Sequence, residues 1–278
     1  MIKLIENILK QGGIEEYQAE AKLIVLEKSG LSLEEILLGK EISSKDEIIM
    51  FANKRVETKK PIQYLLGSAY FMGEKYIVDE SVLIPRDETE ILVNKAYELL
   101  KNKTEKLDIL DIGVGSGCIS CALAKKLKNK QIEILGVDIS LDAIKIALEN
   151  INKLDLIRKV ILRKSDVYSK IRDCEKFDLI ISNPPYIPIK EKDNLQNEVQ
   201  KFEPHLALFA QDENGIEFYE KIINNAKKFL KKDGFIAFEL GISQSNLVKE
   251  LLQKEFKNIE IIKDLQGIER VITAQINI

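Results

Sequence analysis

The sequence predicts an α/β fold: a mostly parallel, seven-stranded sheet with helices on both faces, preceded by a small helical domain. The first observation is that apolar, strand-like segments alternate with amphipathic segments from about residue 90 onward, as in parallel sheets covered on both faces. The second is that apolar residues recur at helical spacing before residue 56. The third is size, because 278 residues, of which 45% are hydrophobic, suffice for one large domain and a smaller one.

Residues 1–70 are predicted to form the helical domain. Turn signals at Gly12 and Gly30 and a candidate N-cap at Ser32 divide the apolar pattern into about four short helices. Acidic residues interrupt the first apolar segment and no small-residue cleavage site follows it, so it is typical of an amphipathic helix and not of a signal peptide. No apolar run approaches the roughly 20 residues that a membrane helix needs. We therefore expect a cytoplasmic protein with no membrane partner.

Residues 71–90 are predicted to form a hairpin or linker. The stretch from residue 61 to 90 is rich in aromatic and β-branched residues and is punctuated by Gly67 and Gly73. The rest of the chain, residues 91–278, is predicted to carry the sheet, whose ligands are expected at the carboxyl ends of the strands. The predicted strands cover residues 107–112, 132–138, 159–164, 177–183 and 234–240, with two more near 258–262 and 269–276.

Charge and cysteine content exclude several classes of protein. The formal net charge of −3 lacks the basic excess of proteins whose affinity comes from phosphate contacts. Three cysteines, Cys118, Cys121 and Cys174, are too few and too odd in number for a disulfide framework, which indicates a reducing compartment. A closed zinc site needs four ligands, and the single histidine, His205, does not complete one, so we expect no metal and assign His205 no role. Cys118 and Cys121 are expected to pack as small apolar residues.

A glycine-rich loop follows the first predicted strand. Asp111 immediately precedes the loop, and Gly113, Gly115 and Gly117 follow at a spacing that lets the backbone turn tightly and approach a ligand closely. A dinucleotide fingerprint would place its third glycine where this chain has Cys118. The carboxylate of Asp111 also suits a neighbouring ammonium group better than a pyrophosphate.

Two further strand ends carry carboxylates. Asp138 follows the second strand, where its oxygens can accept hydrogen bonds from both hydroxyls of a ribose. Asp166 and Val167 follow the third strand, where one can hydrogen-bond an adenine and the other can pack on it. A ribose, an adenine and a cationic amino-acid tail without phosphates describe S-adenosylmethionine, the predicted cofactor.

The fourth strand ends in the tetrad Asn183-Pro184-Pro185-Tyr186. The prolines stop the strand and stiffen the turn. An amide or base amino nitrogen is a poor nucleophile, because its lone pair is delocalised. We expect the Asn183 side-chain oxygen and the Pro184 carbonyl to accept its two hydrogens, and Tyr186 to stack on the planar group, so that rate comes from positioning. Asn183, Pro184 and Tyr186 are thus the predicted catalytic residues.

These motifs resemble the class I S-adenosylmethionine-dependent methyltransferases, and the tetrad resembles those that methylate amino nitrogens of adenine, guanine or glutamine side chains. The chain as a whole resembles the peptide chain release factor N5-glutamine methyltransferases. That resemblance implies a Rossmann-like fold, with a substrate-recognising helical domain at residues 1–70. The segments that carry it are PIQYLLG at 61–67, VLIPRDETEILV at 82–93, NPPYIP at 183–188, EVQKFEPHLAL at 198–208 and DLQGIERVI at 264–272.

The resemblance also implies a substrate and a set of site residues. The substrate would be the glutamine of the Gly-Gly-Gln loop of class I release factors, methylated on its side-chain nitrogen by a monomer that needs no nucleic acid. The segment from Arg86 to Glu90 would border the pocket. Two residues depart from the family pattern, Asp87 at a position usually held by proline and Val167 at one often held by an aromatic residue. The cofactor would contact Gly113, Val114, Gly115, Ser116, Gly117, Asp138, Val167 and Asn183, and the glutamine would contact Asn183, Pro184, Pro185 and Tyr186.

Two other functions stay open. An amino-methylating DNA or ribosomal RNA enzyme could use the same tetrad on an unstacked base, and would predict a basic groove or a sizeable recognition domain. A non-catalytic cofactor-binding or assembly module would predict an eroded tetrad, yet all four residues are present.

Overall fold

The structure, a computed structural model, describes residues 1–277, and the chain divides into two compact units, Met1–Gly67 and Ser68–Ile278. The first unit has one apolar core and the second unit has two. The functional division into residues 1–70, 71–90 and 91–278 stays a prediction.

The first unit is helical, as the sequence predicts. Its helices are α1 (Ile2–Gln11), α2 (Tyr17–Ser29), α3 (Leu33–Leu37), α4 (Lys45–Thr58) and α5 (Ile62–Leu66). Ser32 caps α3 through a capping box, in which its hydroxyl accepts from Glu35 N and the Glu35 carboxylate accepts from Ser32 N. The expectation of extended chain from residue 61 was wrong for α5. Pro61 immediately precedes that helix and Gly67, at φ 68°, ends it in the left-handed conformation.

A buried ion pair joins α2 to α4 within this unit. The Arg55 guanidinium donates through Nε and Nη2 to the two carboxylate oxygens of Glu20, both at 2.8 Å. Arg55 is 2% exposed and Glu20 8%. Paired planar groups of this kind are strong and geometrically specific, so the pair fixes the register of the two helices while the surrounding leucines and isoleucines supply the burial.

The second unit contains the seven-stranded sheet, in the order β10-β11-β9-β6-β3-β4-β5. Adjacent strands from β9 to β5 are parallel, and β11 is antiparallel to both β9 and β10. This confirms the predicted α/β fold. The strands are β3 (Leu107–Ile112), β4 (Ile132–Asp138), β5 (Val160–Lys164), β6 (Phe177–Ser182), β9 (Leu230–Glu239), β10 (Phe256–Lys263) and β11 (Glu269–Ile276).

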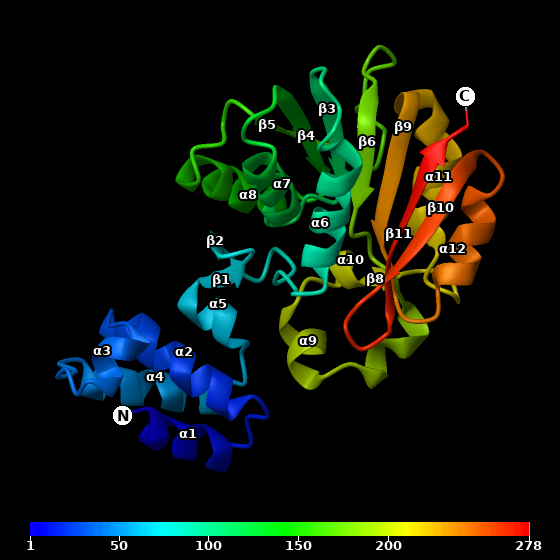
Figure 1. The fold of residues 1–278 in the computed structure, drawn as a ribbon. Helices are drawn as coiled ribbons and strands as arrows, with labels where there is room; N and C mark the ends of the chain where they lie inside the picture. Colours follow the sequence, from blue (N-terminus) through cyan, green and yellow to red (C-terminus); the bar gives the residue numbers. More distant parts are fainter. Residues whose placement is uncertain (278) are drawn as a thin grey trace. The chain divides into compact units, whose positions relative to one another are not determined.

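Helices cover both faces of this sheet (Figure 1). One face carries α6 (Thr89–Leu100), α7 (Cys118–Lys126) and α8 (Leu141–Lys153), and the other carries α11 (Glu217–Phe229) and α12 (Ser245–Leu252). Alternate residues of each strand therefore enter different cores. In β6, Leu179 and Ile181 belong to the core beneath α6, α7 and α8, and Ile180 belongs to the core beneath α11 and α12. This explains why the central residues of the strand are all apolar.

Short elements complete the unit. The hairpin β1 (Ser68–Phe71) and β2 (Glu74–Ile77) lies against α8, where the buried Asn150 side chain accepts from Ile77 N at 2.6 Å and donates to Ile77 O and Ser116 O, both at 2.9 Å. The segment after the tetrad forms β7 (Ile187–Pro188), the 3-10 helix η1 (Ile189–Asn194), α9 (Asn197–Phe202), α10 (His205–Leu208) and β8 (Phe209–Ala210).

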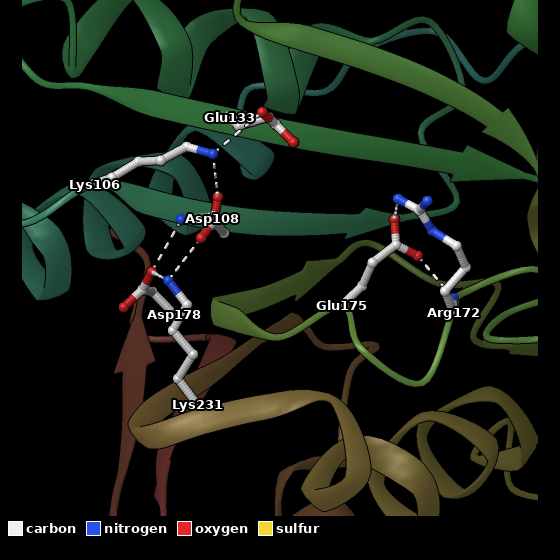
Figure 2. Close-up of polar contacts among 7 residues, drawn as sticks. All are labelled: Lys106, Asp108, Glu133, Arg172, Glu175, Asp178 and Lys231. Carbon is white, nitrogen blue, oxygen red and sulfur yellow. Dashed lines mark hydrogen bonds and ion pairs between the residues drawn. The ribbon is translucent and has the colours of Figure 1, made fainter.

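A charge cluster lies where the parallel strands begin (Figure 2). Asp108, Glu133, Asp178 and Lys231 are each the second residue of a strand. Lys231 Nζ lies 2.7 Å from carboxylate oxygens of both Asp108 and Asp178, and Lys106 contacts Asp108 at 3.0 Å and Glu133 at 3.2 Å. Burial raises the pKa of Asp178, but Lys231 and the Asp108 N–H outweigh it, so the pKa is lowered overall. The cluster fastens the amino ends of the strands.

A second ion pair in Figure 2 lies in the turn before β6. Glu175 accepts from Arg172 and from Arg163 of β5, at 2.8 to 3.0 Å. The Arg163 hydrogen bond is the main cause that lowers the pKa of Glu175 to about 2. Because the charge cluster lies at the amino ends of the strands, the opposite, carboxyl ends are available for a site.

Candidate active site

A cavity opens at the carboxyl ends of β3, β4 and β6, as predicted for this kind of sheet. The turn before α6 and residues of α11 also line it. Three of the predicted site residues do not line the cavity: Asp111, Gly117 and Tyr186. The predicted site residues that line it are Gly113, Val114, Gly115, Ser116, Asp138, Asp166, Val167, Asn183, Pro184 and Pro185.

The glycine loop is built around backbone hydrogen bonds to the neighbouring strand. Gly113 N and Val114 N both donate to Val137 O, at 2.8 and 2.9 Å. Gly113 and Gly115 have φ values of 75° and 53°, a region that side chains with a Cβ rarely occupy. The loop therefore turns away from the strand, and at these glycines the backbone lines the cavity without side chains.

Asp138 holds this loop from the next strand. Its Oδ2 accepts from Gly115 N at 3.0 Å and its Oδ1 accepts from Ser140 N at 2.9 Å. Burial raises the pKa of Asp138, and these backbone donors oppose the shift. Each carboxylate oxygen has two lone pairs, so both oxygens keep the capacity to accept a hydroxyl from a ligand in the cavity.

Asp111 is completely buried behind the loop. Its Oδ2 accepts from Ser120 Oγ of α7 at 2.6 Å, while Oδ1 has no hydrogen-bond partner. Burial raises its pKa to about 7, and the Asp138 charge adds to the shift. A buried carboxylate with an unsatisfied oxygen favours a nearby cation. Direct contact of Asp111 with a cofactor stays a prediction.

Asp166 and Val167, which are predicted to contact the adenine, lie in a tight turn after β5. Val167 has φ 47°, which is unusual for a β-branched residue. Ser165 Oγ donates to Val167 O at 2.9 Å, and Asp166 N donates to Ser169 Oγ at 3.1 Å. These bonds hold the strained turn in place. Helix α11 contributes Phe218, Lys221 and Ile222 to the same cavity.

Asn183 is oriented by α6 and β9. Its Nδ2 donates to Thr89 Oγ1 at 3.4 Å, and Thr89 Oγ1 donates to Glu239 Oε2 at 2.6 Å. Glu239 ends β9 and is 3% exposed. Burial is the main cause that raises its pKa to about 7. The preceding Ser182 donates to Ile112 O at 2.6 Å, which fixes the start of the tetrad against β3.

Tyr186 is held at both ends of the residue. Its hydroxyl donates to Glu239 Oε1 at 3.4 Å, and its carbonyl accepts from Gln244 Nε2 at 2.8 Å. A Cβ at Gly215 would lie 2.0 Å from Tyr186 O, and one at Gly241 would lie 2.9 Å from the ring, so only glycine fits beside it. The Tyr186 ring packs against the core beneath α11 and α12. Its stacking on a substrate stays a prediction.

The predicted segment from Arg86 to Glu90 does border the cavity, through Arg86 and Thr89. Arg86 donates to the buried Glu203 carboxylate, which also accepts from Ile84 N at 3.4 Å. This pair fastens the following segment, whose Pro204, Leu206 and Ala207 form another wall of the cavity. The departure at Asp87 is exposed.

Sequence reasoning missed Glu203, Glu239 and Gln244. Glu239 carries the same signal that identified Asp111 and Asp138, an acidic residue at the carboxyl end of a predicted strand, and it could have been found. Gln244 and Glu203 come from irregular segments and partner groups far away in the sequence, so no local pattern marks them.

Comparison with known proteins decides the family. A family model described as a methyltransferase domain matches residues 103–275. The chain is 35% identical over 282 residues to the release factor glutamine methyltransferase of Bacillus anthracis, and the match covers 99% of this chain and 98% of that relative. This chain belongs to the release factor glutamine methyltransferase family. The resemblance on which the sequence analysis depended is thereby confirmed.

Two further proteins are similar to this family member, one in sequence and one in fold. The chain is 41% identical over 224 residues to the release factor glutamine methyltransferase of Fusobacterium nucleatum, a match that spans 80% of this chain and 61% of that longer relative. The solved catalytic domain of hMettl16 in complex with an RNA hairpin superimposes with a TM-score of 0.59 at 15% identity, and covers 93% of this chain and 89% of that domain. At that identity the similarity concerns the fold alone.

The residues of this methyltransferase fit the cofactor that its family implies. The bare glycine loop, the free acceptor capacity of Asp138 and the buried Asp111 oxygen suit a ligand with hydroxyls and positive charge. Cys118, which also lines the cavity, has a pKa raised to about 12 by burial and stays a neutral thiol. Within residues 1–277, no cluster of three or more His, Cys, Asp or Glu side chains could hold a metal ion, and no helix is long and apolar enough to span a membrane.

Proposed function

We propose that this enzyme transfers a methyl group from S-adenosylmethionine to the side-chain amide nitrogen of the glutamine in the Gly-Gly-Gln loop of class I peptide chain release factors. The proposal places the reaction in the cytoplasm, on a monomer that needs no nucleic acid. The helical unit, Met1–Gly67, would recognise the release factor. The single observation that carries the proposal is the orientation of Asn183 at the cavity.

The side-chain oxygen of Asn183 is the acceptor that the reaction needs. Because Asn183 Nδ2 is directed to Thr89, the amide oxygen is free for an incoming N–H. Pro184, which also lines the cavity, supplies a backbone carbonyl as the second acceptor. Two fixed acceptors hold the substrate amide in one plane and direct its nitrogen, so most of the rate comes from orientation.

The cofactor residues play a complementary part. Asp138 would accept the ribose hydroxyls and the turn at Asp166 and Val167 would hold the adenine. When bound, the cofactor supplies an electrophilic methyl group on a sulfonium. Catalysis by positioning needs no ionisable base, because the amide proton can leave to solvent after transfer.

The test is methyl transfer to two rival substrates. Purified enzyme is incubated with labelled S-adenosylmethionine and either a full-length class I release factor or a mixture of DNA and ribosomal RNA. The proposal predicts label on the release factor alone, at the glutamine. Label only on nucleic acid would contradict the proposed substrate, and label on neither would contradict the proposed activity.

A further inference from the structure

One buried carboxylate is linked to both ends of the tetrad, to Asn183 through Thr89 and to Tyr186 directly. Glu239 Oε2 accepts from Thr89, which in turn accepts from Asn183, and Glu239 Oε1 accepts from Tyr186. The Thr89 to Glu239 contact is short, at 2.6 Å, whereas the Asn183 and Tyr186 contacts are long, at 3.4 Å. Hydrogen bonds in unliganded active sites are often long and tighten in the substrate complex.

The direction of these hydrogen bonds follows from the chemistry of the groups. An ionised carboxylate can only accept, and a hydroxyl has a single hydrogen to give. When Glu239 is ionised, Thr89 therefore gives its hydrogen to Glu239 and can only accept from Asn183. The Asn183 amide must then turn its NH₂ group to Thr89, which leaves its oxygen as the group presented to the cavity.

We propose that Glu239 is a positioning residue that, through Thr89, dictates which end of the Asn183 amide faces the substrate, and that anchors the Tyr186 ring at the same time. The inference rests on the proposed function, because only an acceptor at this place can take a hydrogen from the substrate amide. If the amide flipped, its NH₂ would oppose the substrate NH₂ and the acceptor pair would be lost.

The surroundings keep this arrangement rigid. Glu239 and Thr89 are 3% and 2% exposed. Tyr219 OH donates to the Glu239 backbone carbonyl at 2.9 Å, and the buried Gln244 side chain connects Tyr219 to the Tyr186 carbonyl. The carboxylate thus sits on a fixed strand end, and the threonine on the first residue of a helix, so neither group follows the substrate.

Matched threonine variants test the inference. Thr89→Val keeps the shape and removes the hydroxyl, and Thr89→Ser keeps the hydroxyl. Thr273→Val is the control, because Thr273 is also 2% exposed and does not line the cavity. The readouts are kcat with a full-length release factor and the dissociation constant for S-adenosylmethionine by calorimetry.

The inference predicts a specific pattern. Thr89→Val lowers kcat by about tenfold or more with the cofactor dissociation constant within about twofold of wild type, as expected when an orienting interaction is lost. Thr89→Ser recovers most of that loss, and Thr273→Val behaves as wild type. Should Thr89→Val not fold, the near-isosteric Glu239→Gln takes its place and lowers kcat in the same way, because its amide can present either a donor or an acceptor to Thr89.

Two results would overturn the inference. Wild-type kcat in both Thr89→Val and Glu239→Gln would show that the hydrogen bonds from Asn183 through Thr89 to Glu239 do not position Asn183. Equal losses in Thr89→Ser and Thr89→Val would show that packing matters and the hydroxyl does not. A wild-type enzyme that transfers no methyl group to a release factor would instead contradict the proposed function itself, which the same assay reveals before any variant is made.

Discussion

The Arg86 guanidinium donates to the Glu203 carboxylate, whose side chain is 1% exposed, across 117 residues of sequence. This bond joins the turn before α6 to the segment before α10, and both of these segments line the cavity. A buried charge that loses its partner is costly, so the two segments stay together as one wall.

Glu203→Ala should therefore loosen one wall of the cavity without touching the tetrad. We expect a higher KM for the release factor and for S-adenosylmethionine, and a free energy of unfolding lower by about 1 to 3 kcal/mol, because the Ile84 N–H loses its buried acceptor and the Arg86 side chain, 35% exposed, loses its partner. Steady-state kinetics and urea unfolding measure both. The exposed Glu213→Gln is the control. Unchanged KM values would show that this wall does not shape the site.

The buried carboxyl of Asp111 should make stability depend on pH. Burial raises its folded-state pKa from 3.8 to about 7, so between about pH 4 and 7 the unfolded chain loses this proton while the folded chain keeps it. Stability from this group is full at low pH and declines as pH rises to about 7. Relative to wild type, Asp111→Asn should gain about 1 to 3 kcal/mol between pH 5 and 8.

Urea unfolding of both proteins at pH 5 and pH 8 measures that difference. The exposed Glu213→Gln should show no such relative gain. An Asp111→Asn variant that tracks wild type at both pH values would mean that the buried carboxyl does not titrate in this range.

Activity should also depend on the ionisation of Glu239. Burial raises its pKa from 4.5 to about 7, the Glu88 charge adds to the shift, and hydrogen bonds from Thr89 and Tyr186 and the Arg270 charge oppose it. Tyr219 OH donates to the backbone carbonyl of Glu239. Below about pH 7 a protonated Glu239 can donate to Thr89, which reverses the direction of that hydrogen bond. The Asn183 amide is then no longer held with its oxygen toward the substrate, so kcat should fall as pH decreases. The pH profile of kcat for Glu239→Gln should lack this decrease. An identical decrease in the variant would show that another group causes it.

The charge cluster at the amino ends of the strands should contribute to stability alone. Lys231→Met removes the cation shared by Asp108 and Asp178. Because the lysine side chain is 32% exposed, solvent screens the interaction, and we expect a loss of about 1 kcal/mol in the free energy of unfolding. Kinetic constants should stay at wild-type values. A changed kcat would mean that the two ends of the sheet are coupled.

The sequence alone predicted the sheet and its cavity well for a physical reason. Buried parallel strands are continuously apolar and end abruptly, so β3 and β4 were predicted with their observed bounds. β9 begins at Leu230, before the predicted residue 234, because the polar residues 231–233 resemble a turn although Leu230 pairs with Phe177. Local patterns also placed Asp138 and Asn183 at the cavity.

What the sequence could not show are the long-range partners. The hydrogen bond from Thr89 to Glu239 spans 150 residues, and the one from Gln244 to Tyr186 spans 58. Neither has a local signature, because each depends on which strands are neighbours in the sheet. The site residues themselves were visible, whereas the contacts that orient them required the fold.

Mass spectrometry of the release factor after reaction tests the central claim most directly. The peptide that contains the Gly-Gly-Gln loop is analysed after incubation with S-adenosylmethionine and either wild-type enzyme or Asn183→Ala, once calorimetry has verified that both bind the cofactor. We expect one added methyl group on the glutamine with wild type, and a loss of at least about 100-fold in rate with Asn183→Ala. Equal methylation by both proteins would contradict the role of the Asn183 amide as the substrate acceptor.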